Sequence, residues 1–594
     1  MTEATATARD FADTGDDMGD EAVAAAFASA TPQAQFPSGF TMNKDGLFLE
    51  GDNGPSRVAG SFQVVAQTRD RHSQSWGVLL RWQDDDGQQH QLSIARSMMA
   101  GDGREVRHAL LDGGLYVSPF AKDRNALQTF LGSVKIARRA RAVSRVGWQE
   151  GSFALPDRTI ESGGGDLVVY QGSAVIDHEY RAGGSLEGWQ GSVAKFGEGN
   201  SRVALAICAA FVGPLLGAVG EEGGGIHFRG PSSIGKSTAL LAAASVWGPP
   251  SFVRQWRATQ NGLEGLAEQS NETLLILDEL AQLDAREAGS VAYLLANGTG
   301  KARASQTGEA RAAKRWLAFF LSSGEISLAE HARSDGYGRR SPAGQEVRIL
   351  DVEADAGSGF GLFNTLHVAA TGDELARSIK AGAAEHYGLA GPAFVERLLG
   401  DLGPKSKRIR EGIDLFVESN RPQGSTGQVA RACRRFGLVA MAGELAISLG
   451  VLPWPRGEAV DAARVVFAGW LEARGGAGAH EDRSAVEQVA EFLSTHGASR
   501  FQPLHGDGPL VVHNRAGFWR DNGLGSREYL IPTPTWRNEV CRGLSAKAVS
   551  GLLLKLGHLT PDSMGKASVT VTAPGMGKAR FYIVNQSIFG GDDA

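Results

Sequence analysis

The chain has 594 residues and a formal net charge of −6. Its composition, with 42% hydrophobic and 21% charged residues, is that of a globular protein and excludes a fibrous or wholly disordered chain. At about 150 residues per domain, the length predicts roughly four folded units. The three cysteines, Cys208, Cys433 and Cys541, are too few and too widely spaced for a disulfide framework or a zinc site. We therefore expect a reducing compartment, the cytoplasm.

The negative charge is concentrated at the N-terminus. Residues 1–36 hold seven acids against one base, Arg9, which leaves 59 acids and 59 bases in the rest of the chain. A neutral remainder excludes a global field that would draw the protein to nucleic acid, although local basic segments can still bind it. Because the first segment has few large apolar residues, we predict a disordered acidic tail over residues 1–38.

Residues 39–195 predict a mainly β N-terminal accessory domain. Trp76–Trp82 and the segment QHQLSI, separated by Asp85-Asp86-Gly87, are typical of a β-hairpin. A helical pattern begins at Asn125. The basic run from Lys135 to Arg145 then favours a solvated helix face, with a strip that follows a phosphate backbone as the alternative.

The segment Val203–Val219 contains 17 uncharged, mostly apolar residues, which is the lower limit for a membrane span. It contains Pro214, and two glutamates follow it shortly before a loop that must lie in water. We therefore predict a buried core helix, with a membrane span as the alternative, and we expect no membrane partner.

The residues from Gly230 to Ser237, GPSSIGKS, match the phosphate-binding pattern G-x-x-x-x-G-K-[ST]. Glycines let such a loop turn its N–H groups inward, and the following helix directs its positive end at the same anion. Lys236 would contact the β- and γ-phosphates, and Ser237 would ligate Mg²⁺. The predicted cofactors are ATP and Mg²⁺, and the predicted ligands are Gly230, Pro231, Ser232, Ser233, Ile234, Gly235, Lys236, Ser237 and Thr238.

Two further strands predict the catalytic groups. The apolar run that begins at Thr273 ends in Asp278 and Glu279, at the edge of a parallel sheet where the phosphate loop also lies. Asp278 would hold Mg²⁺ through water, and Glu279 would orient or deprotonate the attacking water. The strand predicted over residues 315–321 is followed by Ser322 and Ser323. In AAA+ ATPases a polar side chain here senses the γ-phosphate, and Ser323 is the first candidate.

Basic residues around these strands are candidates for contacts with DNA and with a neighbouring subunit. Residues 301–315 are typical of a short hairpin around a Thr-Gly turn, and the predicted DNA contacts are Lys301, Arg303, Arg311 and Lys314; a solvated surface hairpin is the alternative. An arginine that reaches the neighbour's γ-phosphate is expected among Arg333, Arg339, Arg340 and Arg348. Arg348 is the first choice, and a structural salt bridge is its alternative.

The remaining sequence predicts a helical region and a last domain. Residues 401–480 form a helical lid or linker region, with loops at 403–408 and 420–427 and a hinge at 475–480. In residues 481–594, Ser484 and Glu487 form a capping box. Helices over 533–540 and 545–559, followed by a hairpin over 568–585, favour a winged-helix domain, which binds DNA or another protein.

The motifs of residues 224–357 resemble those of a known family, the domain of unknown function 927. Its members are Cch-like helicases predicted in bacterial mobile elements and phages. The resemblance rests on GGGIHFRGPSSIGKSTALLAAASVWG, QWRATQNGLEGLAE, LLILDELAQLDAREAGSVAYLLANGTGKARA, LSSGEISLAEH and AGQEVRILDVEADAG. It implies an AAA+ P-loop ATPase core over residues 196–400, a parallel sheet flanked by helices, followed by a C-terminal winged helix.

The function that this resemblance implies is ATP-driven movement along DNA. The protein would form a homo-oligomer, most simply a hexameric ring, on single-stranded or forked DNA, with ATP bound between subunits. Two alternatives stay open. One is an initiator or regulator that uses ATP as an assembly switch, and the other is a mobile-element defence ATPase that acts through a protein partner.

Overall fold

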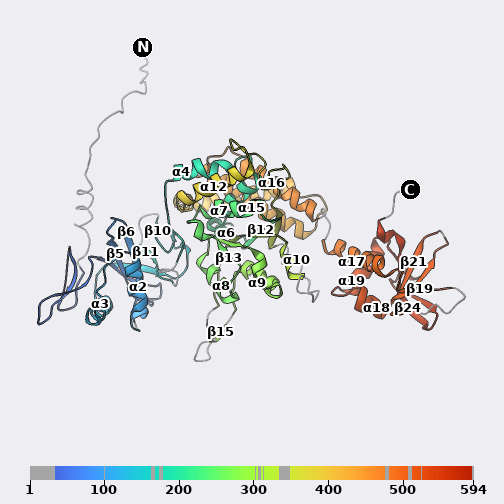
Figure 1. Ribbon diagram of the computed structural model, residues 1–594, viewed down its shortest axis with the longest axis horizontal. Coiled ribbons are helices and arrows are strands. Elements are labelled where there is room, and N and C mark those ends of the chain that lie inside the picture. Colours follow the sequence, from blue (N-terminus) through green and yellow to red (C-terminus); the bar gives the residue numbers. More distant parts are fainter. Residues whose placement is uncertain are drawn as a thin grey trace, which may run out of the picture. The chain divides into compact units, whose positions relative to one another are not determined.

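The computed structural model describes residues 34–99, 101–161, 167–172, 178–301, 303–304, 310–311, 313–333, 348–474, 480–505, 512–523 and 525–590. The chain divides into two compact units, residues 1–178 and 179–594 (Figure 1). This division differs from the domain boundary at 195/196 that the sequence favoured. Together the units form a mixed α/β protein.

The first unit is built around a sheet in which parallel and antiparallel pairs meet. Among the described residues the strand order is β11 (Leu167–Tyr170), β7 (Arg139–Val143), β4 (Gln63–Arg69), β5 (Gly77–Gln83), β6 (Gln89–Ala95). β11, β7 and β4 run parallel, whereas β4, β5 and β6 are antiparallel. The unit also contains α2 (Arg104–Asp112), α3 (Ala121–Ser133) and two smaller sheets, β1 (Phe40–Asn43), β2 (Gly46–Leu49), β3 (Ser56–Ala59) and β8 (Gly147–Gln149), β9 (Ser152–Ala154), β10 (Thr159–Ile160).

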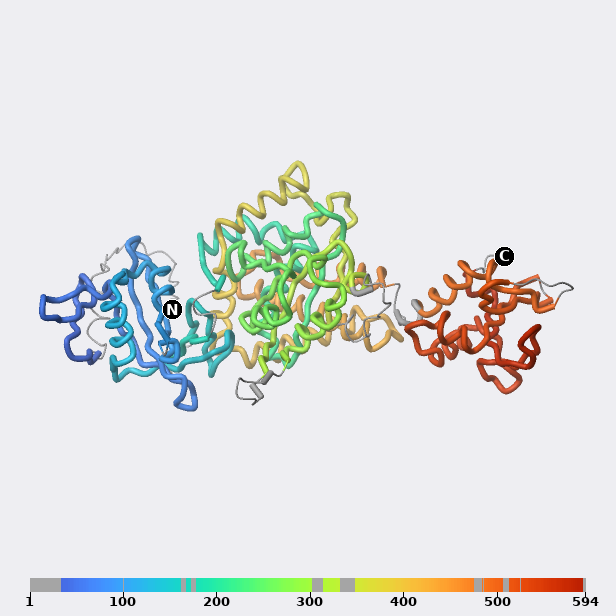
Figure 2. Tube along the Cα trace, turned by 60° about the horizontal axis from the view of Figure 1, so that its bottom comes forward, coloured from blue at the N-terminus to red at the C-terminus, as the bar shows by residue number. Residues whose placement is uncertain are grey.

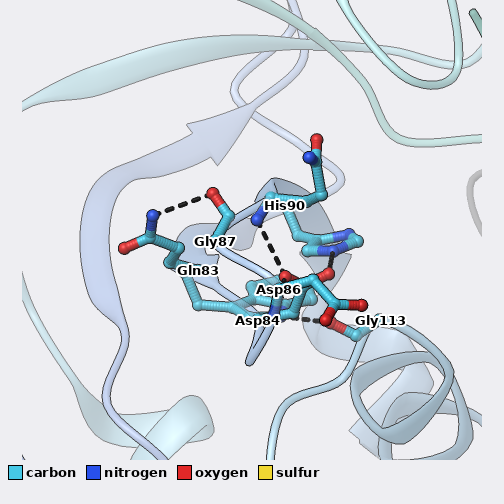
Figure 3. Close-up of polar contacts among 8 residues, drawn as sticks. Gln83, Asp84, Asp86, Gly87, His90 and Gly113 are labelled. Atoms are coloured by element: carbon cyan, nitrogen blue, oxygen red, sulfur yellow. Dashed lines mark hydrogen bonds and ion pairs between the residues drawn. The ribbon is translucent and has the colours of Figure 1, made fainter.

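The hairpin predicted around the Asp-Gly turn is confirmed as β5 and β6. Figure 3 shows how Asp84 organises this turn. Its Oδ1 accepts hydrogen bonds from the backbone N–H groups of Asp86 (3.0 Å) and Gln88 (2.8 Å), and its Oδ2 lies 2.7 Å from His90 Nε2. Gln83 closes the turn by donating from Nε2 to the carbonyl of Gly87 (2.8 Å).

The basic run from Lys135 to Arg145 was assigned wrongly as a helix face, because it forms strand β7. Ala140 and Ala142 are buried in the sheet, while Arg139 and Arg141 alternate with them on the other side. Arg141 pairs with Glu150 at 2.8 Å. The alternation of arginine and alanine is the two-residue period of a strand, and it outweighs the local density of charge.

The second unit is organised by a wholly parallel sheet. Among the described residues its order is β13 (Arg254–Gln255), β14 (Leu274–Asp278), β17 (Phe319–Gly324), β12 (Gly224–Arg229), β18 (Ile349–Glu353). Leu275 and Leu277 of β14 pack on one face against α8 (Gln260–Gln269) and α9 (Ala285–Asn297). The helix α7 (Lys236–Ala244) lies on the opposite side of the sheet (Figure 1). Because all five strands are parallel, their C-terminal ends lie at the same edge of the sheet.

The apolar segment Val203–Val219 is buried, as predicted, but it forms two helices instead of one. These are α5 (Ser201–Ala210) and α6 (Gly213–Val219), which are bent by 65° relative to each other. Pro214 lies in the first turn of α6, where its missing N–H costs nothing, so the chain turns just before it. No single helix in the described part of the chain is long and apolar enough to cross a membrane. Only α5 and α6 taken together, despite the bend between them, reach the necessary length and apolar composition.

A layer of helices follows the sheet in the sequence. It comprises α12 (Gly372–Glu385), α13 (Ala390–Glu396), α14 (Leu402–Asn420), α15 (Gly427–Ser448) and α16 (Glu458–Ala473). α15 and α16 pack against α5, α14 packs against α6, and α12 packs against α7. Residues 403–408, predicted as a loop, belong to α14, because their Gly-Pro pair stands in the first turn where proline is tolerated. At Gly443 of α15 an added Cβ would lie 2.3 Å from Cys208 Sγ, so this glycine allows α15 to approach α5 closely.

The C-terminal segment contains α17 (His480–His496), α18 (Thr533–Thr535), a π-helical turn (Trp536–Val540) and α19 (Ala546–Lys555). Its sheet runs in the order β19 (Phe501–Pro503), β20 (Gly517–Asp521), β21 (Arg527–Pro532), β24 (Gly577–Asn585), β22 (Leu559–Thr560), with β23 (Val569–Ala573) paired to β24. Figure 2 traces the segment at the red end of the chain. The first predicted helical segment and the hairpin are confirmed, whereas the second helix, predicted over 545–559, ends at Lys555 and Leu559 belongs to β22. Ser484 lies inside α17, so the capping-box start was wrong, and most of the predicted hinge, residues 475–479, lies outside the described residues.

Candidate functional site

The loop between β12 and α7, residues 230–235, makes a tight turn that requires unusual backbone angles. Gly230 (φ 152°), Ser233 (φ 65°) and Gly235 (φ 109°) adopt left-handed conformations that favour glycine. At Gly235 an added Cβ would also lie 2.9 Å from Leu362 Cβ, so glycine is required there for space as well. The loop leads directly into the N-terminus of α7, whose first N–H groups have no partner within the helix.

Lys236 places its ammonium group inside this loop. Nζ donates hydrogen bonds of 2.7 Å to the carbonyl oxygens of Gly230 and Pro231. Partial burial lowers the pKa of Lys236, and the charges of Glu325 and Asp278 oppose that shift. The ammonium group is thus positioned where phosphate oxygens could replace the two carbonyls as its partners.

Asp278 lies where three elements meet. Its Oδ2 accepts a hydrogen bond from Ser237 Oγ of α7 at 3.3 Å. Its Oδ1 accepts from Ser323 Oγ of β17 and from the backbone N–H of Glu279 at 3.0 Å. The predicted metal ligands, Ser237 and Asp278, are therefore brought together by the fold.

The two serines of β17 face opposite sides of the sheet. The strand runs from Phe319 to Gly324 and not over residues 315–321, so both serines lie within it. Ser323 faces Asp278, whereas Ser322 accepts a hydrogen bond from Trp256 Nε1 (2.8 Å) and lies 2.9 Å from His227 Nδ1. The alternation along the strand separates the two candidates, and Ser323 is the one at the site.

Glu279 has a left-handed backbone conformation, with φ 60° and ψ 68°. Glutamate adopts this conformation at a cost in free energy, and such strain is typical of functional positions. The carboxylate accepts a hydrogen bond from Gln282 Nε2. Gln282 was not among the predicted site residues, because nothing in its local sequence distinguishes it from an ordinary helix residue.

These residues line a cleft of about 920 Å³. One wall is the phosphate loop with Asp278, Glu279 and Ser323. A second wall, which the sequence analysis missed, comes from the segment after β18 and from α12 and includes Phe360, Phe363, Asp373, Ala376 and Lys380. The glycine-rich run around Phe360 was the available signal, but no motif assigned it a function.

The cleft fits a nucleoside triphosphate with Mg²⁺. Hydroxyl and carboxylate oxygens, here from Ser237 and Asp278, are the ligands that Mg²⁺ prefers. The hydroxyl of Thr238 is buried and has no hydrogen-bond partner among the described residues. The curled loop supplies backbone N–H groups for phosphate oxygens, and Lys236 supplies a cation.

The predicted DNA-contacting residues lie on and beside a short hairpin. Its strands are β15 (Arg303–Ala304) and β16 (Ala310–Arg311), and Arg303 pairs with Arg311 in the backbone register. The tip and the side chains of both arginines lie outside what the structure describes. At the base of the hairpin, Lys301 Nζ donates to Gln260 (2.7 Å) and Lys314 forms an ion pair with Glu268 (2.8 Å), both on α8.

Arg348 lies just before β18, at the edge of the sheet opposite the phosphate loop. Its guanidinium donates to Asn297 Oδ1 (2.8 Å) and covers the ring of Tyr293 at 4.8 Å. Arg348 does not line the cleft. Of the other candidates, Arg339 and Arg340 and the side chain of Arg333 fall outside the described residues.

Comparison with known proteins places these motifs in a family. No curated protein matches the chain. A solved structure described as "SCCmec type IV Cch - active helicase" has the same fold, with a TM-score of 0.64 and 17% sequence identity, over 93% of this chain and 99% of that one. Residues 39–315 match the family model Domain of unknown function (DUF927), which includes the phosphate loop, Asp278 and Glu279 but ends before β17. Over these residues the chain is therefore similar to the DUF927 family.

Proposed function

We propose that the protein is an AAA+ ATPase that hydrolyses ATP and uses the energy to move along DNA, as a helicase or translocase. The observation that supports this most strongly is the meeting of Lys236, Ser237, Asp278 and Ser323 at one edge of a parallel sheet. The strand order also supports the AAA+ class, because β17 with its polar side chain lies between the phosphate-loop strand and the acidic strand.

In this proposal each side chain has a separate task. The loop N–H groups and Lys236 bind the phosphates and offset charge that develops on them. When bound, Mg²⁺ would neutralise part of the negative charge of the phosphates. Ser237 and Asp278 would hold the metal, Glu279 would orient or deprotonate the attacking water, and Ser323 would donate its one hydroxyl proton either to the Asp278 carboxylate or, with nucleotide bound, to the γ-phosphate.

A ring of identical subunits, most simply a hexamer, would complete the site. Arg348 lies away from its own cleft, and it would exchange its contacts with Asn297 and Tyr293 for the neighbour's cleft. The hairpins of β15 and β16 would then hold single-stranded or forked DNA through Lys301, Arg303, Arg311 and Lys314 and would move when ATP is hydrolysed. The described helicase with the same fold supports this assignment.

The test is the ATPase rate of the purified protein with and without forked DNA, followed by strand displacement. We expect a several-fold rise on DNA and ATP-dependent displacement, both lost in Lys236→Ala. A rate that does not respond to DNA, but is lost in Lys236→Ala, would contradict the helicase. The ATP-switched initiator or the defence ATPase with a protein partner would then be favoured.

A further inference from the structure

The order of strands decides which way a nucleotide would lie in the cleft. β12, which leads into the phosphate loop, has β17 on one side and β18 on the other. Asp278, Glu279 and Ser323 belong to the β17 side, so the terminal phosphate would lie there. The sugar and base would extend toward the β18 side, where the segment after β18 forms the second wall of the cleft.

That segment contains a loop of unusual construction. Gly357 (φ 77°), Gly359 (φ 82°) and Gly361 (φ 62°) are all left-handed, and Phe360 lies among them. The loop is closed by a hydrogen bond of 2.7 Å from the Ala356 N–H to the Gly361 carbonyl. Three glycines in this conformation fold the chain tightly enough to present one side chain at its tip.

The loop is also fixed to the phosphate loop. The Leu362 N–H donates a hydrogen bond of 2.9 Å to the carbonyl of Ile234. At Gly361 an added Cβ would lie 2.7 Å from the same carbonyl oxygen, so the two backbones touch. Phe360 is therefore held at a defined position relative to the phosphate-binding groups.

Phe360 differs from its neighbour Phe363 in exposure. Both line the cleft, but the side chain of Phe363 is only 2% exposed, whereas that of Phe360 is 44% exposed. Asp373, Ala376 and Lys380, which are spaced along one face of α12, also line the cleft. Ala376, in the middle of this face, has the smallest side chain of the three.

We propose that Phe360 is the base-stacking residue of the nucleotide site, with the base held between its ring and the Ala376 face of α12. This inference rests on the proposed function, since it requires that the cleft binds a nucleoside triphosphate. Stacking on an aromatic ring is favourable for any base, because every base has a π-face. Phe360 thus contributes affinity for the nucleoside and none for the phosphates.

The test compares two ligands by calorimetry, ATP and inorganic tripolyphosphate, on the full chain. In Phe360→Ala, ATP should bind roughly 5- to 150-fold more weakly, the range expected for loss of one stacked base. Tripolyphosphate, which has no base, should bind within about twofold of its wild-type affinity. Phe360→Trp should restore ATP binding, because it restores an aromatic face.

Val368→Ala is the matched control. Val368 belongs to the same connecting segment, is 95% exposed and does not line the cleft, so both ligands should bind as in the wild type. Equal weakening of ATP and tripolyphosphate in Phe360→Ala, or no weakening of either, would overturn the stacking assignment while leaving the nucleotide site in place. A wild-type protein that binds neither ligand would instead overturn the nucleotide site itself, and the stacking assignment with it.

Discussion

Ser323 of β17 donates a hydrogen bond to Asp278 of β14 and so joins the ends of two neighbouring strands at the cleft. The preceding residue, Ser322, points to the other face of the sheet and bonds with Trp256 and His227. Two adjacent and chemically identical side chains therefore have different tasks, one at the site and one in the interior, and each can be removed separately.

Ser323→Ala should lower the turnover number roughly 10- to 100-fold, the range typical for loss of a partner that orients a metal ligand. The folded protein should keep its stability, because the alanine leaves Asp278 with its bonds to Ser237 and to the Glu279 N–H. Steady-state ATPase assays and thermal unfolding check the two parts. Unchanged turnover would contradict the position assigned to Ser323.

Ser322→Ala is the matched comparison and should show the reverse pattern. It leaves Trp256 Nε1 and His227 Nδ1 without their buried partner, at a cost of about 1–3 kcal/mol in the free energy of unfolding. Turnover per folded molecule should stay near the wild-type value. A large loss of turnover without destabilisation would show that Ser322, and not Ser323, serves the cleft.

His227 should make stability depend on pH. Burial lowers its pKa from 6.5 to about 4, and the neutral ring is held by Ser322 and by the Ile326 carbonyl, to which Nε2 donates. Between these pH values the unfolded chain binds a proton that the folded chain does not, so stability is full above pH 6.5 and falls as the pH drops toward 4. His227→Gln should remove about 2 kcal/mol of the loss between pH 7 and pH 5, measured by urea unfolding. Equal losses in both proteins would contradict the assignment.

The hairpin of β15 and β16 should be needed for stimulation of the ATPase by DNA and not for ATP hydrolysis without DNA. Arg303→Ala with Arg311→Ala should abolish stimulation by DNA while the DNA-free ATPase rate persists, because the pair stands outside the cleft. The slope of log affinity against log salt should fall by roughly 1 to 2, as expected for two lost phosphate contacts. Arg286→Ala, on the exposed surface of α9, is the control and should change neither quantity. Stimulation that survives in the double variant would exclude the hairpin as the DNA contact.

Arg348 should act in the neighbour's site. Arg348→Ala and Lys236→Ala should each be inactive alone, but a mixture of the two should regain about a quarter of the wild-type rate if subunits mix randomly in a ring. The recovered sites combine an intact phosphate loop from one variant with an intact Arg348 from the other. Asn297→Ala removes only the contact within the subunit and should stay active. A mixture without recovery would assign Arg348 a structural role.

The wall of the cleft that contains the glycine-rich loop could be predicted from sequence, because its polar residues stand in short consecutive motifs. Gly230 to Ser237 and the Asp278-Glu279 pair stand at the ends of apolar strands, and parallel strands bring such ends together. The wall with Phe360 and α12 could not be predicted, because these residues reach the cleft only through the path of the chain after β18. A single aromatic residue in a glycine-rich loop matches no sequence motif that would identify it as part of a site.

The errors in the fold had a similar origin. The charges of Arg139 and Arg141 favoured a solvated helix face, whereas the alternating buried alanines indicate a strand. The apolar run Val203–Val219 was continuous in composition, so only the position of Pro214 indicated that it would form two helices. In the first segment the two-residue period predicted the structure better than the density of charge. In the second segment the position of the proline predicted it better than the overall apolar composition.

The most direct test of the account is Glu279→Gln, measured for both hydrolysis and nucleotide binding. The account predicts that hydrolysis is lost, because the amide cannot accept a proton from water, whereas ATP affinity stays near that of the wild type, because the phosphate loop and Lys236 are untouched. Hydrolysis at the wild-type rate in this variant would contradict the assignment of the catalytic centre to the cleft beside Asp278.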